Sequence, residues 1–311
     1  MGKIVRFIGD CVMSFANDDG YAMASHIALS GLTAIFPFLI FVTSLAGFLG
    51  AQPLADGAAS AFFEIWPPRV AGPIVSEIHN VLSNRHGGLL TISAALAAYF
   101  SSSGVEALRT GLNRAYGAQE TRPWWRLRLQ SIGYVFIGAL ALLALAFLLV
   151  LWPIFWTAIL AQAPALQALS KMVAFGRYAI ATVLLLTALI VAHRLLPNRE
   201  LSLRQTAPGI ALTFSAWMIF ALAFSTYLGR FALNYVATYA GLASVMIAIV
   251  FLYMLASIFI FGGELNAALI RARDRRQKTK AAVTSRRLFR LRTPSAKART
   301  QKRTTRGRDP L

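Results

Sequence analysis

The sequence predicts an all-α fold: a polytopic membrane helix bundle with about six transmembrane helices, an N-terminal interfacial helix and a disordered basic C-terminal tail. Of its 311 residues, 57% are hydrophobic and only 14% are charged, whereas soluble domains average about a quarter charged residues. Apolar stretches long enough to cross the roughly 30 Å bilayer core recur along the chain. Residues 271–311 hold 16 of the 31 Lys and Arg residues, so positive charge is concentrated in the tail.

Residues 1–25 form the first predicted segment, a cytoplasmic amphipathic helix. Its apolar side chains recur at helical spacing among charged ones, and they are Ile4, Val5, Phe7, Ile8, Cys11, Val12 and Phe15. This pattern is typical of a helix that lies in the membrane interface. A helix packed on the cytoplasmic face of the bundle would show the same pattern, so both interpretations stay open.

Residues 26–270 form the predicted transmembrane domain. Its six spans are residues 27–49, 89–108, 132–152, 178–196, 208–228 and 241–270. Each reaches the length of about 20 residues that a bilayer core requires. Pro37 interrupts the first span, and a proline kink is tolerated in a membrane where neighbouring groups satisfy the freed carbonyl. Interfacial aromatic side chains are expected beside the third span, and they are Trp124, Trp125, Trp152 and Trp156.

The basic residues in the loops predict the orientation of the bundle. The stretches 109–129 and 194–204 carry eight arginines on one side of the membrane, and the opposite side carries five Lys or Arg residues. Basic residues favour the cytoplasmic side. Together with the basic tail, this bias places both termini in the cytoplasm, which an even number of spans also requires.

The basic tail, residues 271–311, has few large apolar side chains and cannot bury enough surface to fold alone, so we expect it to be disordered. Its expected partners are the anionic headgroups of membrane lipids, at about 1 kcal/mol per basic residue near the surface. Nucleic acid would attract the same charges. Phe289 is the one aromatic residue of the tail, so no base-stacking platform is predicted and no specific nucleic acid is expected.

The second span ends in a polar face. Its members are spaced by four, three and four residues and so share one side of a helix, and they are Ser102, Glu106, Arg109 and Asn113. A charge that faces lipid is costly, so Glu106 should face protein or water. Small residues upstream recur every four positions, which favours close helix packing in a bilayer.

With this orientation, the ends of the second and sixth spans both lie in the cytoplasmic third of the bundle. Glu264 and Asn266 are at the end of the sixth span. One hypothesis is a polar cavity open to the cytoplasm, with Glu106, Arg109 and Glu264 on its wall. The other is a structural clasp that joins these two spans and binds no ligand. In either case Arg109 would pair with Glu106 or with Glu264.

His26 and His193 lie near the cytoplasmic ends of the first and fourth spans. Each is either a hydrogen-bonded interfacial residue or part of a proton relay, since histidine titrates near neutral pH. The four histidines of the chain show no spacing typical of a metal site. No catalytic nucleophile or nucleotide-binding motif is present. We therefore expect no enzyme activity, no catalytic residue, no metal site and no cofactor.

Several stretches resemble the YihY/BrkB family of bacterial inner-membrane proteins. They are Ser102-Ser-Gly-Val-Glu-Ala-Leu with Asn113-Arg-Ala-Tyr116, Leu196-Pro-Asn198, Ala207-Pro-Gly209, and Tyr239-Ala-Gly-Leu-Ala-Ser through Phe261-Gly-Gly-Glu-Leu-Asn-Ala267. The resemblance covers roughly residues 20–270. It implies a six-span protein of the bacterial inner (plasma) membrane with cytoplasmic termini. The positions that match the family are Glu106, Asn113, Pro208, Gly209, Gly263, Glu264 and Asn266.

The family also carries an old ribonuclease BN label for tRNA processing, which this sequence does not support because it lacks the metal cluster of a nuclease. Other members are linked to envelope biogenesis, serum resistance and the movement of lipid or lipopolysaccharide precursors. The leading hypothesis is therefore a transporter or flippase-like protein for a lipid or lipid-linked envelope precursor. The alternative is a non-catalytic membrane scaffold for envelope assembly. The sequence specifies neither the substrate nor the oligomeric state.

Overall fold

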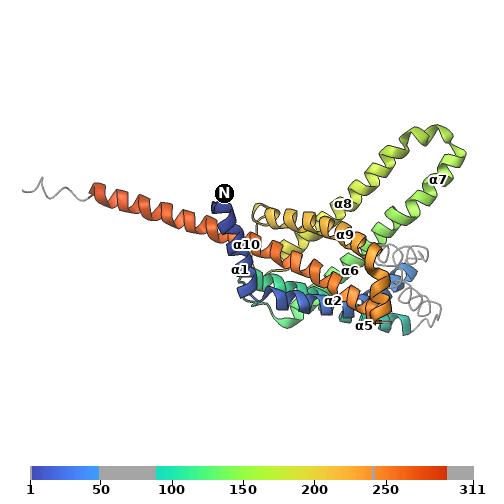
Figure 1. Ribbon diagram of the computed structural model, residues 1–311, viewed down its shortest axis with the longest axis horizontal. Coiled ribbons are helices and arrows are strands. Elements are labelled where there is room, and N and C mark those ends of the chain that lie inside the picture. The colour runs from blue at the N-terminus through green and yellow to red at the C-terminus, as the bar shows by residue number, and fades with distance from the viewer. Residues whose placement is uncertain (1, 49–88, 240–241, 293–311) are drawn as a thin grey trace, which may run out of the picture. The chain divides into compact units, whose positions relative to one another are not determined.

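The computed structural model describes residues 2–48, 89–239 and 242–292, and the regular secondary structure in those ranges is helical (Figure 1). The helices are α1 (Gly2–Asn17), α2 (Gly20–Phe48), α5 (Leu89–Ala115), α6 (Trp124–Ala146), the π-helical η1 (Phe147–Leu151), α7 (Trp152–Gln162), the 3₁₀-helical η2 (Pro164–Leu169), α8 (Ser170–Leu195), α9 (Leu203–Tyr239) and α10 (Leu242–Arg292). The chain forms two compact units, Met1–Asn266 and Ala267–Leu311. The predicted all-α class is confirmed.

Within the described ranges, five helical segments are long and apolar enough to cross a membrane. They are Gly20–Val42, Trp124–Leu149, Pro164–Leu195, Leu203–Gly229 and Val245–Thr279. These segments correspond to five of the six predicted spans. The remaining span, residues 89–108, is helical within α5. It is less apolar than the other five because its C-terminal half contains three serines and Glu106.

The polar helix α5 packs against α2 and α6, and α2 and α5 lie side by side in Figure 1. The contact with α2 is close, since a Cβ on Gly104 would lie only 3.3 Å from the Cβ of Ala34. Three serines of α5, Ser101, Ser102 and Ser103, donate their hydroxyl groups to carbonyls of their own helix; Ser102 Oγ, for example, donates to the carbonyl of Tyr99 at 2.6 Å. In this part of α5 the buried side chains are therefore small, and the serine hydroxyl groups already have partners.

The third predicted span continues beyond its expected end at residue 152. α6 passes through η1 directly into α7. Pro153 accounts for the wide π-helical turn, because it has no N–H and its ring clashes with the carbonyl four residues earlier. Closer to the start of this span, Val42 of α2 is buried with Ala139, Leu143 and Ala146 of α6, which together form part of the apolar core.

The N-terminal helix α1 combines features of both interpretations of its sequence. Cys11 and Phe15 are buried, and the ring of Phe15 meets the ring of Phe261 edge-on with centroids 6.0 Å apart. This face packs on the helices that follow. Ile8 and Met13 are exposed on α1, so the helix also presents an apolar surface of the kind that suits a membrane interface.

The basic C-terminal segment is more ordered than its composition predicts. α10 continues as a helix to Arg292, so the predicted disorder of residues 271–311 is corrected for residues 271–292. Two effects account for the helix. Extending an existing helix avoids the unfavourable nucleation step, and Arg, Lys, Gln and Ala are good helix formers. The rest of the predicted tail, residues 293–311, and the loop between the first two spans lie outside the described residues.

Candidate functional site

An open cavity of about 810 Å³ lies beside the C-terminal half of α5 and the start of α6. Its lining includes Tyr99, Glu106, Arg109, Asn113, Arg114, Glu120, Trp124 and Arg128. Three of the four residues predicted to share a polar helix face, Glu106, Arg109 and Asn113, therefore line one cavity. The fourth, Ser102, is fully buried on α5 and does not line it.

Arg109 reaches α6 instead of either predicted carboxylate. The residue is only 4% exposed, and its Nη2 donates to the carbonyl of Leu127 at 3.1 Å and to Ser131 Oγ. Among the described residues, no carboxylate oxygen lies within 4 Å of its guanidinium. The predicted pairing with Glu106 or Glu264 is thus replaced by two neutral oxygens, because the side chain extends across the contact between α5 and α6.

Glu106 has a different partner from the one predicted. Its Oε2 lies 2.9 Å from Nη1 of Arg128, a residue of α6. Arg128 also donates from Nη2 to the carbonyl of Tyr99 at 3.0 Å, and its guanidinium lies 3.6 Å from the centroid of the Tyr99 ring. An arginine that contacts two acceptors and stacks on an aromatic ring is held more firmly than an isolated surface pair. Glu106 and Arg128 therefore form a fixed wall of the cavity.

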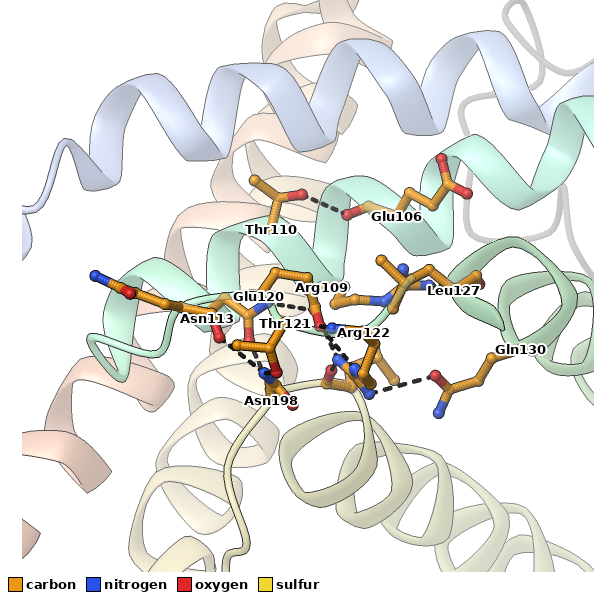
Figure 2. A network of polar contacts seen from close by, with 12 residues as sticks. Glu106, Arg109, Thr110, Asn113, Glu120, Thr121, Arg122, Leu127, Gln130 and Asn198 are labelled. Carbon is orange, nitrogen blue, oxygen red and sulfur yellow. Dashed lines mark hydrogen bonds and ion pairs between the residues drawn. The ribbon is translucent and has the colours of Figure 1, made fainter. Parts of the chain in front are cut away.

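A second group of polar contacts joins the end of α5 to the loop that follows it (Figure 2). Asn113 Nδ2 donates to Glu120 Oε2 at 3.0 Å. Arg122 donates from Nε and Nη2 to the two carboxylate oxygens of Glu120, both at 2.7 Å. The fork-like contact with Arg122 is the main reason that the pKa of Glu120 falls to about 2.

The same group connects the α5–α6 loop to the α8–α9 loop. The backbone N–H of Asn198 donates to Asn113 Oδ1 at 2.7 Å, and its side-chain Nδ2 donates to the carbonyl of Gln119, also at 2.7 Å. Arg122 Nη2 donates to the carbonyl of Leu196 at 3.0 Å. The structure thus contains a clasp that joins these two loops.

Asn266 and Glu264 of α10 lie apart from the cavity, and Asn266 forms a junction with α9. Both are fully buried, and neither lines the cavity. Asn266 Oδ1 accepts from the N–H of Gly209 at 2.7 Å, and its Nδ2 donates to Tyr116 Oη and to the carbonyl of Thr206, each at 3.0 Å. The hypothesis of Glu264 on the cavity wall is therefore corrected: this carboxyl is fully buried and does not line the cavity.

Tyr116 links the junction to the region of the cavity. Its phenol oxygen accepts from Asn266, and its backbone carbonyl accepts from Arg199 Nη1 at 3.3 Å. Burial raises the pKa of Tyr116 to about 12, so the phenol stays neutral at physiological pH. It therefore acts in the junction as a neutral hydrogen-bonding group.

The two histidines occupy different environments. His26 is exposed on α2. His193 on α8 is fully buried, with its Nδ1 3.1 Å from the carbonyl of Leu189 and its ring centroid 4.6 Å from that of Phe259. The proton relay stays a prediction. Among the described residues, no group of three or more His, Cys, Asp or Glu side chains is placed to hold a metal ion.

The sequence did not predict the residues that contact Glu106, Arg109 and Asn113. In the sequence, Arg122 and Arg128 count only as positive loop charges, and Glu120 precedes Arg122 by two residues without forming any known motif. Asn198 and Tyr116 did carry a signal, because each ends a stretch that resembles the family. Nothing in the sequence alone indicates that Asn198 contacts Asn113, 85 residues earlier.

Comparison with known proteins tests the family resemblance. The model of the virulence factor BrkB family matches residues 12–286. YfkH of Bacillus subtilis strain 168, named as a ribonuclease-like protein, is 31% identical over 270 residues, which cover 85% of this chain and 95% of that relative. A UPF0761 membrane protein of Rhodospirillum centenum is 26% identical over 269 residues, which cover 85% of this chain but only 57% of that relative. No solved structure matches the chain. The resemblance is confirmed, and this multi-pass membrane protein belongs to the virulence factor BrkB family.

Proposed function

We propose that this protein is a transporter or flippase-like protein for a lipid or lipid-linked envelope precursor. We place it in the bacterial inner (plasma) membrane with both termini in the cytoplasm. The observation that carries the proposal is the 810 Å³ cavity, which combines a charged wall with aromatic residues in helices α5 and α6. A cavity of this size accommodates a headgroup or a small ligand.

The surroundings of the cavity suit an amphiphile. Phe100 on α5 and Leu129 on α6 are both more than half exposed, and Trp124, which lines the cavity, is 77% exposed. In a bilayer such side chains contact acyl chains or sit at the interface. A headgroup would occupy the polar cavity while its chains remain against the apolar helices.

Lipid translocation in proteoliposomes tests the proposal. Glu106→Gln removes the ion pair with Arg128 that forms one wall, and we expect it to slow the movement of a fluorescent phospholipid between leaflets. Glu200→Gln is the matched control, since Glu200 is exposed in the α8–α9 loop and does not line this cavity. Equal translocation by the wild type, Glu106→Gln and protein-free liposomes would contradict the proposal.

The alternative proposal is a non-catalytic scaffold for envelope assembly. The observation that favours it is the basic helix that continues α10 to Arg292, which could hold acidic partners or anionic headgroups. Deletion of residues 275–311 discriminates between the two. A scaffold that works through this segment loses its partners, whereas a transporter keeps its flux.

We further propose that the chain is not an enzyme, although the relative YfkH is named ribonuclease-like. Incubation of the purified protein with tRNA, with and without a chelator, tests this point. Reproducible cleavage by the wild type that is lost in Arg122→Gln but kept in Arg126→Gln would overturn it.

A further inference from the structure

The charges around the α5–α6 cavity can be matched one by one. Glu106 pairs with Arg128, and Glu120 pairs with Arg122. Arg114 pairs with Asp19 at the exposed end of the cavity. Arg109 is the lining arginine left over, since within the described part of the chain no carboxylate oxygen lies within 4 Å of its guanidinium. The cavity therefore carries an uncompensated positive charge on a residue that is only 4% exposed.

Some N–H donors of the arginines that line the cavity also lack hydrogen-bond partners within the described ranges. A guanidinium has five N–H donors, and the two bonds that Arg109 makes both come from Nη2. Its Nε is buried and has no hydrogen-bond partner among the described residues, and the same holds for Nε of Arg128. Both arginines line the cavity. Unsatisfied buried N–H groups of charged side chains are costly.

We infer that the cavity takes a phosphate group, and the inference rests on the proposed function in assigning that phosphate to the headgroup of a lipid. A guanidinium matches the geometry of phosphate oxygens and binds them more strongly than neutral acceptors. The anion would supply the negative charge that Arg109 lacks and would lie against the arginine side chains that line the cavity. Glu106 and Glu120 do not oppose it strongly, because each already has an arginine partner.

The rim of the cavity favours a lipid phosphate over a free phosphate ion. Tyr99 and Trp124 line the opening and are 44% and 77% exposed. A free phosphate ion gains nothing from exposed aromatic rings, whereas the glycerol and acyl region of a lipid can pack on them. The structure therefore assigns a diacylglycerol phosphate as the simplest ligand class.

Native mass spectrometry of the full-length protein tests this inference by comparing dioleoyl phosphatidic acid with dioleoylglycerol, which has the same chains and no phosphate. We expect the wild type to retain the phosphate lipid at least about tenfold better, the ratio that one charged hydrogen bond supplies. Arg109→Gln should remove this preference and leave dioleoylglycerol retention unchanged. Arg126→Gln, which makes the same change at an exposed α6 residue outside the cavity, should keep the preference.

The outcomes separate this inference from the proposed function. Equal retention of both lipids by the wild type overturns the phosphate inference but leaves a lipid-handling cavity in place, and this comparison needs no variant to fold. Equal preference in folded Arg109→Gln and wild type also overturns it. If inorganic phosphate raises the melting temperature of the wild type but not of Arg109→Gln while neither lipid is retained, the phosphate site stands and the lipid function fails. Failure of all three ligands to bind overturns both.

Discussion

The amide of Asn266 shows what one buried polar residue does in this bundle. Its oxygen and nitrogen together contact a backbone N–H, a backbone carbonyl and the phenol of Tyr116. Pro208 lies next to Gly209 in α9 and cannot donate a hydrogen bond, so the helix is already short of one donor there. Asn266 binds the α9 backbone at that irregular position and ties it to α10.

Asn266→Leu should therefore destabilise the protein more than its loss of polarity suggests. The leucine leaves buried polar groups without partners, at a cost of about 1–3 kcal/mol for each group that water cannot reach. A thermal unfolding assay in detergent measures the effect. Gln162→Leu is the control, because Gln162 is an exposed amide at the end of α7. An equal melting temperature for both variants would show that the Asn266 hydrogen bonds contribute nothing.

Glu120 gives the protein a pH-dependent contact. Its folded pKa is about 2 against an ordinary value of 4.5, chiefly because Arg122 donates to the carboxylate. A lowered folded pKa means that the contribution to stability is fully present above pH 4.5 and is lost as the pH falls toward 2. The melting-temperature difference between the wild type and Glu120→Gln should be constant from pH 7 to pH 5 and shrink below pH 4.5. A difference that does not change between pH 5 and pH 3 contradicts this assignment.

Among the helices, α9 and α10 approach each other closely where two glycines meet. A Cβ on Gly209 would overlap the carbonyl oxygen of Gly262 and the side chain of Asn266. A Cβ on Gly262 would overlap Thr213 Oγ1 and lie 2.9 Å from the carbonyl oxygen of Gly209. Small residues at a crossing let two membrane helices approach to backbone contact, and this approach is what brings Asn266 within reach of α9.

Gly209→Ala and Gly262→Ala should each separate the two helices and lower the melting temperature. Overpacking of this kind costs about 1–3 kcal/mol, since backbone atoms, unlike a flexible side chain, cannot move aside. Gly229→Ala is the matched control on the same helix, because nothing lies within 4 Å of its Cβ. That control should be neutral or stabilising by up to about 1 kcal/mol, through better helix propensity. Three equal effects would mean that the crossing is not tightly packed.

The whole bundle shows which features a sequence can predict. Length and hydropathy predict the helices, because the bilayer imposes both. The shared face of Glu106, Arg109 and Asn113 also follows from helical spacing. The hydrogen-bond partners of these residues do not follow from helical spacing. Arg109 binds Ser131, 22 residues away on another helix, and this contact depends on how the helices pack. The helix of residues 271–292, where disorder was predicted, has a local cause: the helical propensity of these residues outweighs the effect of their charge.

The contacts between loops also constrain the topology of the whole molecule. Asn198 of the α8–α9 loop binds Asn113 at the end of α5, so the α5–α6 and α8–α9 loops must lie on the same side of the membrane. Two candidate spans separate them, Trp124–Leu149 and Pro164–Leu195. The second of these spans begins with η2, so the η2 turn should lie on the opposite side. The loop arginines favour the cytoplasm for the two bonded loops.

Labelling of single cysteines tests this topology. Cys11 is the one cysteine of the chain, so Cys11→Ala gives a background without cysteine. Gln119→Cys, Glu200→Cys and Gln167→Cys each place a thiol at an exposed position, in the α5–α6 loop, the α8–α9 loop and η2 respectively. A membrane-impermeant maleimide applied to spheroplasts should label the η2 position alone, and lysis should expose the other two together. Labelling of Gln119→Cys and Glu200→Cys from opposite sides would be incompatible with the hydrogen bonds between the loops. Labelling of both from outside would keep the fold and reverse its orientation.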